Sequence, residues 1–190
     1  MASRRPLQIP LIAILGVLTA CVGPTPTLEP TLPPRPAAPD GWRTITSDRG
    51  EVTVIVPPDL IMANTDGAIS GFRDPEGAAE GVIVTATGPA RVEQRAPGES
   101  VGEWVRRRNL LTAGRDGLGA VVQREVLLPA GPALEMSAPW QVDGAERWTI
   151  LYVIDTGRGY ALLQFDGAGP SPVEPPDEVR VMRELVEFEP

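Results

Sequence analysis

The stretch of sequence that decides the fold is "ERWTILYVI", residues 146 to 154. Its side chains alternate as those of a β-strand do, yet both sets are apolar. One face carries Trp148, Ile150, Tyr152 and Ile154, and the other carries Leu151 and Val153. The next strand, "YALLQF" at 160–165, is also apolar on both faces. Because an antiparallel sheet usually leaves one face in water, this pattern predicts a layer of structure on each side of the sheet.

Two helices are expected to supply these layers. The first begins at "SVGE", where Ser100 and Glu103 form a capping box, and it is expected to end at Gly114. Its apolar side consists of Val101, Trp104, Val105, Leu111 and the stem of Arg108. The second is predicted over 175–184, and its apolar stripe consists of Val179, Met182 and Val186. A short strand within 185–189 is expected to follow.

The remaining strands are read from alternation and turn signals. "EVTVIV" at 51–56 is a strand, and 42–46 is its hairpin partner across the turn "SDRG". Further strands are predicted over 81–87, 120–128 and 133–142, with a hairpin turn at Asp143-Gly144, and 59–80 is expected to be a long loop. The fold class predicted is α+β: an α/β/α sandwich whose central antiparallel sheet has six or seven strands and helices on both faces.

The N-terminal residues indicate export and a lipid anchor. Arg4 and Arg5 precede an apolar run over 7–18, which is the pattern of a signal peptide and is shorter than the ~20 residues that a membrane span needs. The string "LTAC" at 18–21 resembles the lipobox of bacterial lipoproteins. The resemblance implies that Cys21 is acylated, with palmitate among its fatty acids, and becomes the mature N-terminus. The alternative is an ordinary signal peptide that ends at Ala20 and leaves a free thiol.

A proline-rich tract over 22–39 follows the cysteine. It favours extended polyproline II, which at ~3.1 Å per residue would hold a domain up to roughly 55 Å from the membrane. A proline-rich ligand for a partner domain is the alternative. The predicted organisation is therefore a signal peptide at 1–20, a lipidated cysteine and tether at 21–39, and one globular domain at 40–190.

Charge limits the partners. The chain of 190 residues has a formal net charge of −8, and loss of Arg4 and Arg5 with the signal would leave 15 basic residues against 25 acidic ones. Such an acidic surface argues against binding nucleic acid, and it implies that contact with the membrane depends on the lipid.

The order of elements is similar to that of Mog1/PsbP-like domains found in many bacterial lipoproteins. The similar stretches are an opening Trp strand, "VTVIVPPDL", "ESVGEWVRRRNLL", "YALLQF" and a closing "LVEFE". The resemblance covers 40–190 and implies an α/β/α sandwich in an accessory or binding protein. It supplies no catalytic residues.

Catalytic and cofactor chemistry is mostly excluded by composition. The chain has no His and no Lys, which removes histidine acid–base catalysis, histidine metal sites and lysine Schiff bases. "NTDG" at 64–67 lacks the ligands of a calcium loop and is read as a turn, and "GRDGLG" at 114–119 is read as a helix end and turn rather than a nucleotide loop. No cofactor and no metal are expected.

Three functions stay open. The favoured one is a membrane-anchored, non-catalytic accessory protein that docks on an envelope partner, for example in assembly of a membrane complex. The second is a small-ligand binding module, in which Trp42, Trp140 and Trp148 line a pocket with the 59–80 loop. Arg106 and Arg107 are candidates for gripping an anion, although a solvated helix face explains them too. The third is a hydrolase that uses paired carboxylates among its loop acids.

Overall fold

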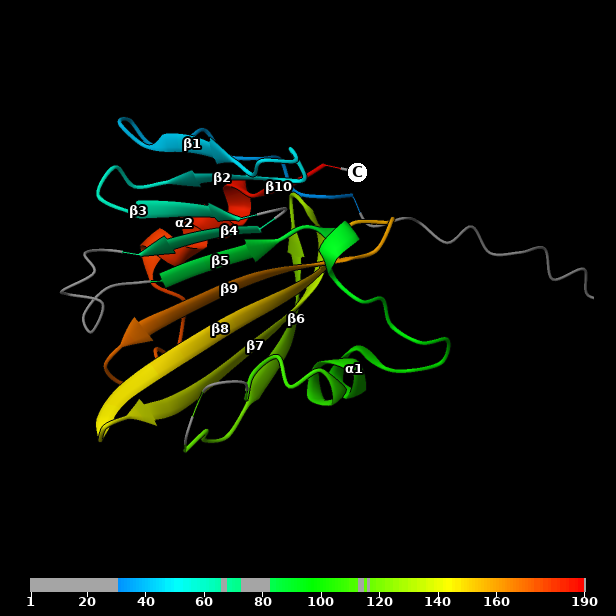
Figure 1. Ribbon diagram of the computed structural model, residues 1–190, viewed down its shortest axis with the longest axis vertical. Helices are drawn as coiled ribbons and strands as arrows, with labels where there is room; N and C mark the ends of the chain where they lie inside the picture. The colour runs from blue at the N-terminus through cyan, green and yellow to red at the C-terminus, as the bar shows by residue number, and fades with distance from the viewer. Residues whose placement is uncertain (1–30, 66–67, 73–82, 113–114, 116, 190) are drawn as a thin grey trace, which may run out of the picture. The chain divides into compact units, whose positions relative to one another are not determined.

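The computed structural model describes residues 31–65, 68–72, 83–112, 115 and 117–189, and within them it shows two antiparallel sheets and two α-helices (Figure 1). In spatial order the larger sheet consists of β3 (Ile61–Thr65), β4 (Ala68–Phe72), β5 (Ile83–Thr87), β9 (Tyr160–Ala168), β8 (Ala145–Asp155), β7 (Gly131–Val142) and β6 (Val122–Leu128). The smaller sheet consists of β1 (Arg43–Thr46), β2 (Val52–Val56) and β10 (Glu187–Phe188). The helices are α1 (Val101–Arg107) and α2 (Asp177–Leu185), and a short 3-10 helix, η1, spans Pro89–Arg91.

Strand β8 is buried on both faces, as its sequence predicts. Every residue from Trp148 to Ile154 is buried, and from Ile150 to Ile154 successive residues belong to different hydrophobic clusters. Ile150 and Tyr152 belong to the first cluster, which also includes the β2 valines, Phe165 of β9 and Val179 of α2. Leu151 belongs to the second cluster, with Trp104 and Val105 of α1. The alternation of this one strand therefore divides the core in two.

The predicted antiparallel sheet of six or seven strands is confirmed by the larger sheet, which has seven, but the hairpin β1–β2 is not part of it and forms a separate sheet with β10. The two strands pair as a hairpin, as predicted, with Arg43 opposite Val56 and Thr46 opposite Thr53. The other edge of β2 is occupied by β10, which pairs Phe188 with Val52. With both edges taken, β2 has no free edge for the larger sheet, so its valines reach the core through their side chains.

The segment 59–80, expected to be one long loop, contains a hairpin. Strands β3 and β4 pair from Ile61 opposite Phe72 to Thr65 opposite Ala68, and β4 then pairs with β5. The two residues between the strands, Asp66 and Gly67, lie outside the described residues. They repeat the Asp-Gly dipeptide that the sequence offers at 143–144, where the β7–β8 hairpin turns.

Helix α1 begins where predicted but is shorter than expected. The capping box is present, because the backbone N–H of Glu103 donates to Ser100 Oγ at 3.2 Å and that of Ser100 donates to Glu103 Oε2 at 2.9 Å. The predicted end at Gly114 is wrong, since the helix ends at Arg107 and Asn109 takes a left-handed φ of 53°. The amides of Asn109 and Leu110 donate to the carbonyls of Arg106 and Val105, which is a Schellman motif.

The C-terminal elements follow the prediction within two residues. Helix α2 buries Val179, Met182 and Leu185, and β10 comes directly after Val186. Arg35, inside the predicted tether, donates to Glu187 of β10 and, at 3.5 Å, to the carbonyl of Val186. The chain therefore contacts the smaller sheet before residue 40. Residues 1–30, which include Cys21 and the predicted signal peptide, lie outside the described residues.

Candidate functional site

The three tryptophans proposed as pocket residues are not brought onto one face. Trp42 is half-buried against the first cluster, and Trp148 is a buried member of that cluster. Trp140 is opposite Arg147 in the β7–β8 pairing, so these two residues lie on the same face of the larger sheet. Arg147 and Trp148 are successive residues of β8 and lie on opposite faces, so Trp140 and Trp148 lie on opposite faces too. The indole of Trp148 also donates to the carbonyl of Ala168 at 3.1 Å, which fixes its orientation.

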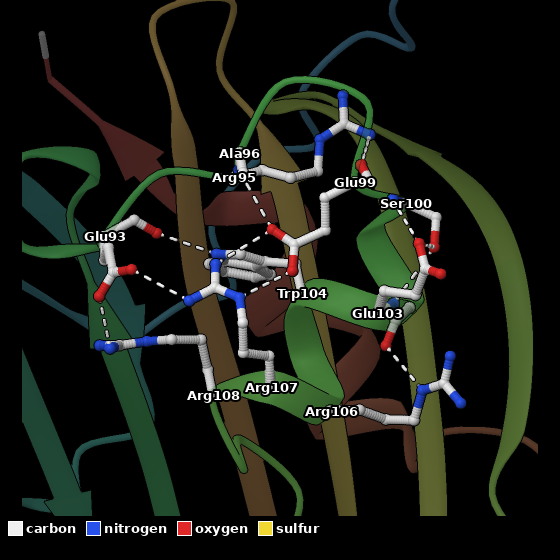
Figure 2. A network of polar contacts seen from close by, with 11 residues as sticks. Glu93, Arg95, Ala96, Glu99, Ser100, Glu103, Trp104, Arg106, Arg107 and Arg108 are labelled. Atoms are coloured by element: carbon white, nitrogen blue, oxygen red, sulfur yellow. Dashed lines mark hydrogen bonds and ion pairs between the residues drawn. The ribbon is translucent and has the colours of Figure 1, made fainter.

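The arginines of α1 lie in a network of carboxylates (Figure 2). Arg107 donates to both oxygens of Glu99, at 2.7 and 3.0 Å, and to Glu93 at 3.1 Å. Arg108 donates to the second oxygen of Glu93 at 2.6 Å. Arg106 is placed differently, since its Nε lies 3.4 Å from the carbonyl of Gly102. Of the two predicted anion-gripping residues, Arg107 is thus already paired with two carboxylates.

Electrostatics in this network favour the charged forms. The hydrogen bond from Arg107 lowers the pKa of Glu99, and hydrogen bonds to Glu99 and Glu93 raise the pKa of Arg107. Hydrogen bonds from the Ser100 side chain and backbone lower the pKa of Glu103. Arg107 and Glu103 are exposed and Glu99 is half-buried, so the network is screened by salt and each pair adds little to stability.

Trp104 connects this network to the larger sheet. Its side chain is fully buried, and its Nε1 donates to the carbonyl of Glu93 at 3.0 Å. Its ring lies 5.6 Å from the ring of Tyr160 on β9, at an interplanar angle of 36°. The guanidinium of Arg95 lies 5.7 Å from the same tyrosine ring. The segment before α1 is therefore held on the sheet by one buried indole and several exposed ion pairs.

A second group of polar side chains gathers on the same face of the larger sheet, and we call it the Arg115 cluster. Its members come from β7, β8, β9 and the segment that follows α1: Arg115, Trp140, Arg147, Thr149, Gln164 and Asp166. Strand register brings them together, because Trp140 is opposite Arg147 and Thr149 is opposite Asp166. Directly opposite residues of antiparallel strands lie on the same face, with Cβ atoms about 4.5–5.5 Å apart.

Arg115 links the members of this cluster. Its guanidinium donates to both oxygens of Asp166, with NH2 at 2.8 and 3.0 Å and Nε at 3.2 Å. Its Cζ lies 5.5 Å from the centroid of the Trp140 ring, within the range of a cation–π contact. Gln164 donates to the second oxygen of Asp166 at 2.7 Å. Only 8% of the Arg115 side chain is exposed, so this ion pair is largely withdrawn from water.

The Arg115 cluster also holds buried polar atoms that lack hydrogen-bond partners. Within the described part of the chain these are Trp140 Nε1, Arg147 Nε and Thr149 Oγ1. Two are N–H donors and the third is a hydroxyl, and Thr149 is fully buried. A buried polar atom without a partner lowers the stability of the folded state by about 1–3 kcal/mol. Three such atoms in adjacent positions therefore destabilise this one part of the sheet.

A third group, the Glu135 cluster, lies on the other face and consists of Arg124, Glu135, Tyr152 and Arg183. Glu135 of β7 is opposite Arg124 of β6 on one side and Tyr152 of β8 on the other. Arg124 donates to Glu135 Oε1 at 2.5 Å, and Arg183 of α2 donates to Oε2 at 2.9 Å and to the hydroxyl of Tyr152 at 3.0 Å. Burial is the main cause that raises the pKa of Tyr152, and the charge of Arg183 opposes it.

Sequence reasoning missed both of these clusters. The available signal was a polar residue inside an otherwise apolar strand. Thr149 interrupts "ERWTILYVI", Glu135 interrupts an apolar stretch of β7, and Asp166 ends the apolar run of β9. Arg115 gave no such signal, because its pairing with Asp166 spans 51 residues of sequence.

The described residues contain no group of three or more His, Cys, Asp or Glu side chains placed to hold a metal ion. Among the same residues, neither helix has the length and apolar character that crossing a bilayer requires.

No protein-family model and no curated protein matches the chain. Among solved structures it is similar to a protein from Bacteroides thetaiotaomicron VPI-5482, with 11% identity and a TM-score of 0.47 over 79% of this chain and 49% of that one. The chain thus spans about half the length of that protein. A mutant of the protein Mog1 gives 12% identity and a TM-score of 0.46, over 68% of this chain and 78% of that one.

LpqN of Mycobacterium tuberculosis, described as involved in cell envelope biogenesis, gives 16% identity and a TM-score of 0.41, over 78% of this chain and 91% of that one. All three similarities have TM-scores below 0.5, so they carry no argument about the function of this chain.

Proposed function

We propose that this chain is an exported, lipid-anchored protein without catalytic activity, and that it docks on an envelope protein through the edge strand β6. The observation that carries the proposal is the open edge of the larger sheet at β6. The anchor at Cys21, the tether and the location outside the cytoplasm rest on the N-terminal sequence pattern. The partner supplies an extended segment that pairs with the β6 backbone.

Strand β6 has the features of an accessible edge. It is last in the strand order, so only its β7 side is paired within the sheet. No backbone hydrogen bond joins it to any other described segment. Val122 is 63% exposed and Leu127 is 39% exposed, and the strand contains no proline. Edge strands of this kind accept an added strand, whose backbone supplies the affinity.

The chemistry of the described residues supports a non-catalytic role. A general acid at neutral pH needs a raised carboxyl pKa, whereas the carboxyl groups that shift, Glu99 and Glu103, have lowered ones. The buried carboxylate of Glu135 accepts hydrogen bonds from two arginines, Arg124 and Arg183, so both of its oxygens are already engaged. These observations weigh against a carboxylate hydrolase.

The fold proposed for residues 40–190 is Mog1/PsbP-like, with helices on both faces of the larger sheet. The support is the sequence pattern together with the division of β8 between two clusters. Trp104 of α1 packs with Leu151, and Val179 of α2 packs in the cluster of Ile150.

Photo-crosslinking in the native envelope tests the docking proposal. Amine-reactive reagents would not label the side chains, because the chain has no lysine. A benzophenone amino acid is therefore placed at Val122, and in a matched control at Val173, which is 96% exposed and lies outside both sheets. We expect an adduct with one envelope protein from position 122 and not from position 173.

Three results would overturn this assignment. They are no adduct from position 122 in protein confirmed on the membrane, an adduct from position 173 alone, and an adduct of this chain with itself. The anchor has a separate test: Cys21→Ser should move the protein from the detergent phase to the aqueous phase of a detergent extraction. Equal partitioning of the two forms would refute lipidation.

A further inference from the structure

We propose that the Arg115 cluster is a binding site for a carboxylate group, a role distinct from docking at β6. The site uses the indole N–H of Trp140, the guanidinium of Arg147 and the hydroxyl of Thr149 as hydrogen-bond donors. These three residues lie at adjacent positions on one face of β7 and β8.

The first argument is the unpaired hydrogen-bonding capacity of the three side chains. Native proteins pair nearly all of their buried polar atoms with protein or water. The other two buried indoles follow this rule, because Trp104 donates to the carbonyl of Glu93 and Trp148 donates to that of Ala168. Trp140 Nε1 has no partner among the described residues, and neither do Arg147 Nε and Thr149 Oγ1. Each of the three can donate a hydrogen bond to an oxygen acceptor.

The second argument is charge. The bidentate ion pair with Arg115 already compensates the negative charge of Asp166. The guanidinium of Arg147 makes no ion pair with any described carboxylate, which leaves one positive charge in the cluster. A carboxylate group matches both this single charge and the requirement for an oxygen acceptor, and guanidinium binds carboxylates with well-defined geometry.

The third argument is that contacts with the sheet hold the residues around these three donors in position. Arg115 is held by the hydrogen bonds that it donates to Asp166 and by its contact with the ring of Trp140, and Gly119 donates its N–H to the carbonyl of Pro139 at 2.8 Å. Arg115 and Gly119 are thus both held against residues near the end of β7. Exposure increases from this cluster toward the hairpin end of β7 and β8, where Gln141 and Glu146 are exposed and Arg147 is half-buried.

Titration of the full chain in detergent, with 15N-labelled tryptophan indoles, tests the site. The chain has four tryptophans, hence four indole N–H signals, and Trp140→Phe identifies that of Trp140. Benzoate is the probe, and benzamide is its uncharged counterpart of similar shape. We expect benzoate to shift the Trp140 signal saturably and benzamide to leave it in place. The Trp104 and Trp148 signals should not move, because their N–H groups are already bonded to carbonyls.

Variants separate a ligand site from merely unpaired atoms. Arg147→Gln should weaken benzoate binding about tenfold or more, because it removes a charged donor. Arg180→Gln is the control, since that arginine is exposed on α2 and pairs with Asp177. Thr149→Val should raise the melting temperature, as expected when an unpaired buried hydroxyl is removed, and should also weaken benzoate binding.

The carboxylate could belong to a peptide C-terminus or to a free acid. To distinguish the two, binding is measured for a tripeptide with a free C-terminus and for the same tripeptide amidated. Tighter binding of the free tripeptide than of benzoate would assign a peptide end, and the reverse order would assign a free acid. The proposal is overturned by a Trp140 signal that does not move with either probe, or by equal affinities of Arg147→Gln and Arg180→Gln. Neither result bears on the crosslinks from β6, so the two proposals fail independently.

Discussion

Arg183 on α2 donates a hydrogen bond of 2.9 Å to the carboxylate of Glu135 on β7, whose side chain is only 5% exposed. This bond joins the second helix to the larger sheet across 48 residues of sequence. Arg124 of β6 bonds the other oxygen of the same carboxylate, so Glu135 is the shared acceptor of two cations.

Replacing Glu135 should be strongly destabilising. Glu135→Ala leaves the largely buried guanidinium of Arg183 without its anion, and loss of one partner of a buried pair typically costs about 3–5 kcal/mol. Urea unfolding followed by circular dichroism should show a loss of about 3 kcal/mol. Glu174→Ala is the matched control, because Glu174 pairs with Arg124 but is 74% exposed, and it should cost less than about 1 kcal/mol. Equal losses in the two variants would contradict this interpretation.

Alkaline pH should destabilise the protein through Tyr152. Its pKa is raised in the folded state, so the folded state retains the phenolic proton at pH values where the unfolded state releases it. Stability is therefore complete below the unfolded pKa of about 10 and falls as the pH rises above that value. The chain has no lysine to titrate in this range and only one other tyrosine, Tyr160.

The free energy of unfolding, measured between pH 8 and pH 12, checks this assignment. It should fall above pH 10 in the native sequence and should change much less in Tyr152→Phe. In the control, Tyr160→Phe, the free energy of unfolding should still fall above pH 10. If the fall disappears in Tyr160→Phe and persists in Tyr152→Phe, the role of Tyr152 is refuted.

Gly167 on β9 should tolerate no side chain. A Cβ atom there would lie 2.1 Å from Cζ2 of Trp148, a buried ring held by its bond to Ala168. Gly167→Ala should therefore cost about 2 kcal/mol or more, as overpacking does. Gly102→Ala in α1 is the opposite case, because its Cβ would meet only a distant Gln123 oxygen at 3.9 Å and alanine favours a helix. Thermal melts should shift down for the first and up for the second.

Removing Arg107 should change the titration of Glu99. Its hydrogen bond is the main cause that lowers the Glu99 pKa, so Arg107→Ala should return that pKa upward toward the ordinary value. Carbon-13 NMR of the carboxyl groups measures this directly. Arg106→Ala is the control and should leave Glu99 unchanged, because Arg106 acts on Glu103 instead. A Glu99 pKa that responds equally to both variants would show a general charge effect.

The strands predicted from alternation are confirmed where strands that follow one another in the sequence also pair with one another in the sheet. β7, β8 and β9 form a meander, and the Asp143-Gly144 turn, with Asp143 at φ 50° and Gly144 at φ 79°, closes its first hairpin. The double burial of β8 followed from six apolar residues. Each of these predictions rests on a pattern inside one strand or on the turn between two neighbouring strands.

The errors have local and non-local causes. Helix α1 ends early because Asn109 adopts a left-handed conformation, a signal present in the sequence but outweighed by the apolar spacing of Leu111. The separate smaller sheet was not predictable from pattern, because the pairing of β10 with β2 joins residues more than 130 positions apart. The Arg115 cluster is similar, since no periodicity relates Arg115 to Asp166.

The pairing of β10 with β2 has a consequence for the order of events in synthesis. Phe188 lies opposite Val52, and the amide of Glu189 donates to the carbonyl of Glu51 at 2.9 Å. The smaller sheet therefore has only two strands until residues 187 and 188 have been made, and an isolated two-stranded hairpin is at best marginally stable. Translation must reach residue 188 before this sheet is complete, so a nascent chain keeps an unpaired edge at β2 while the more than 130 residues between the two strands are added.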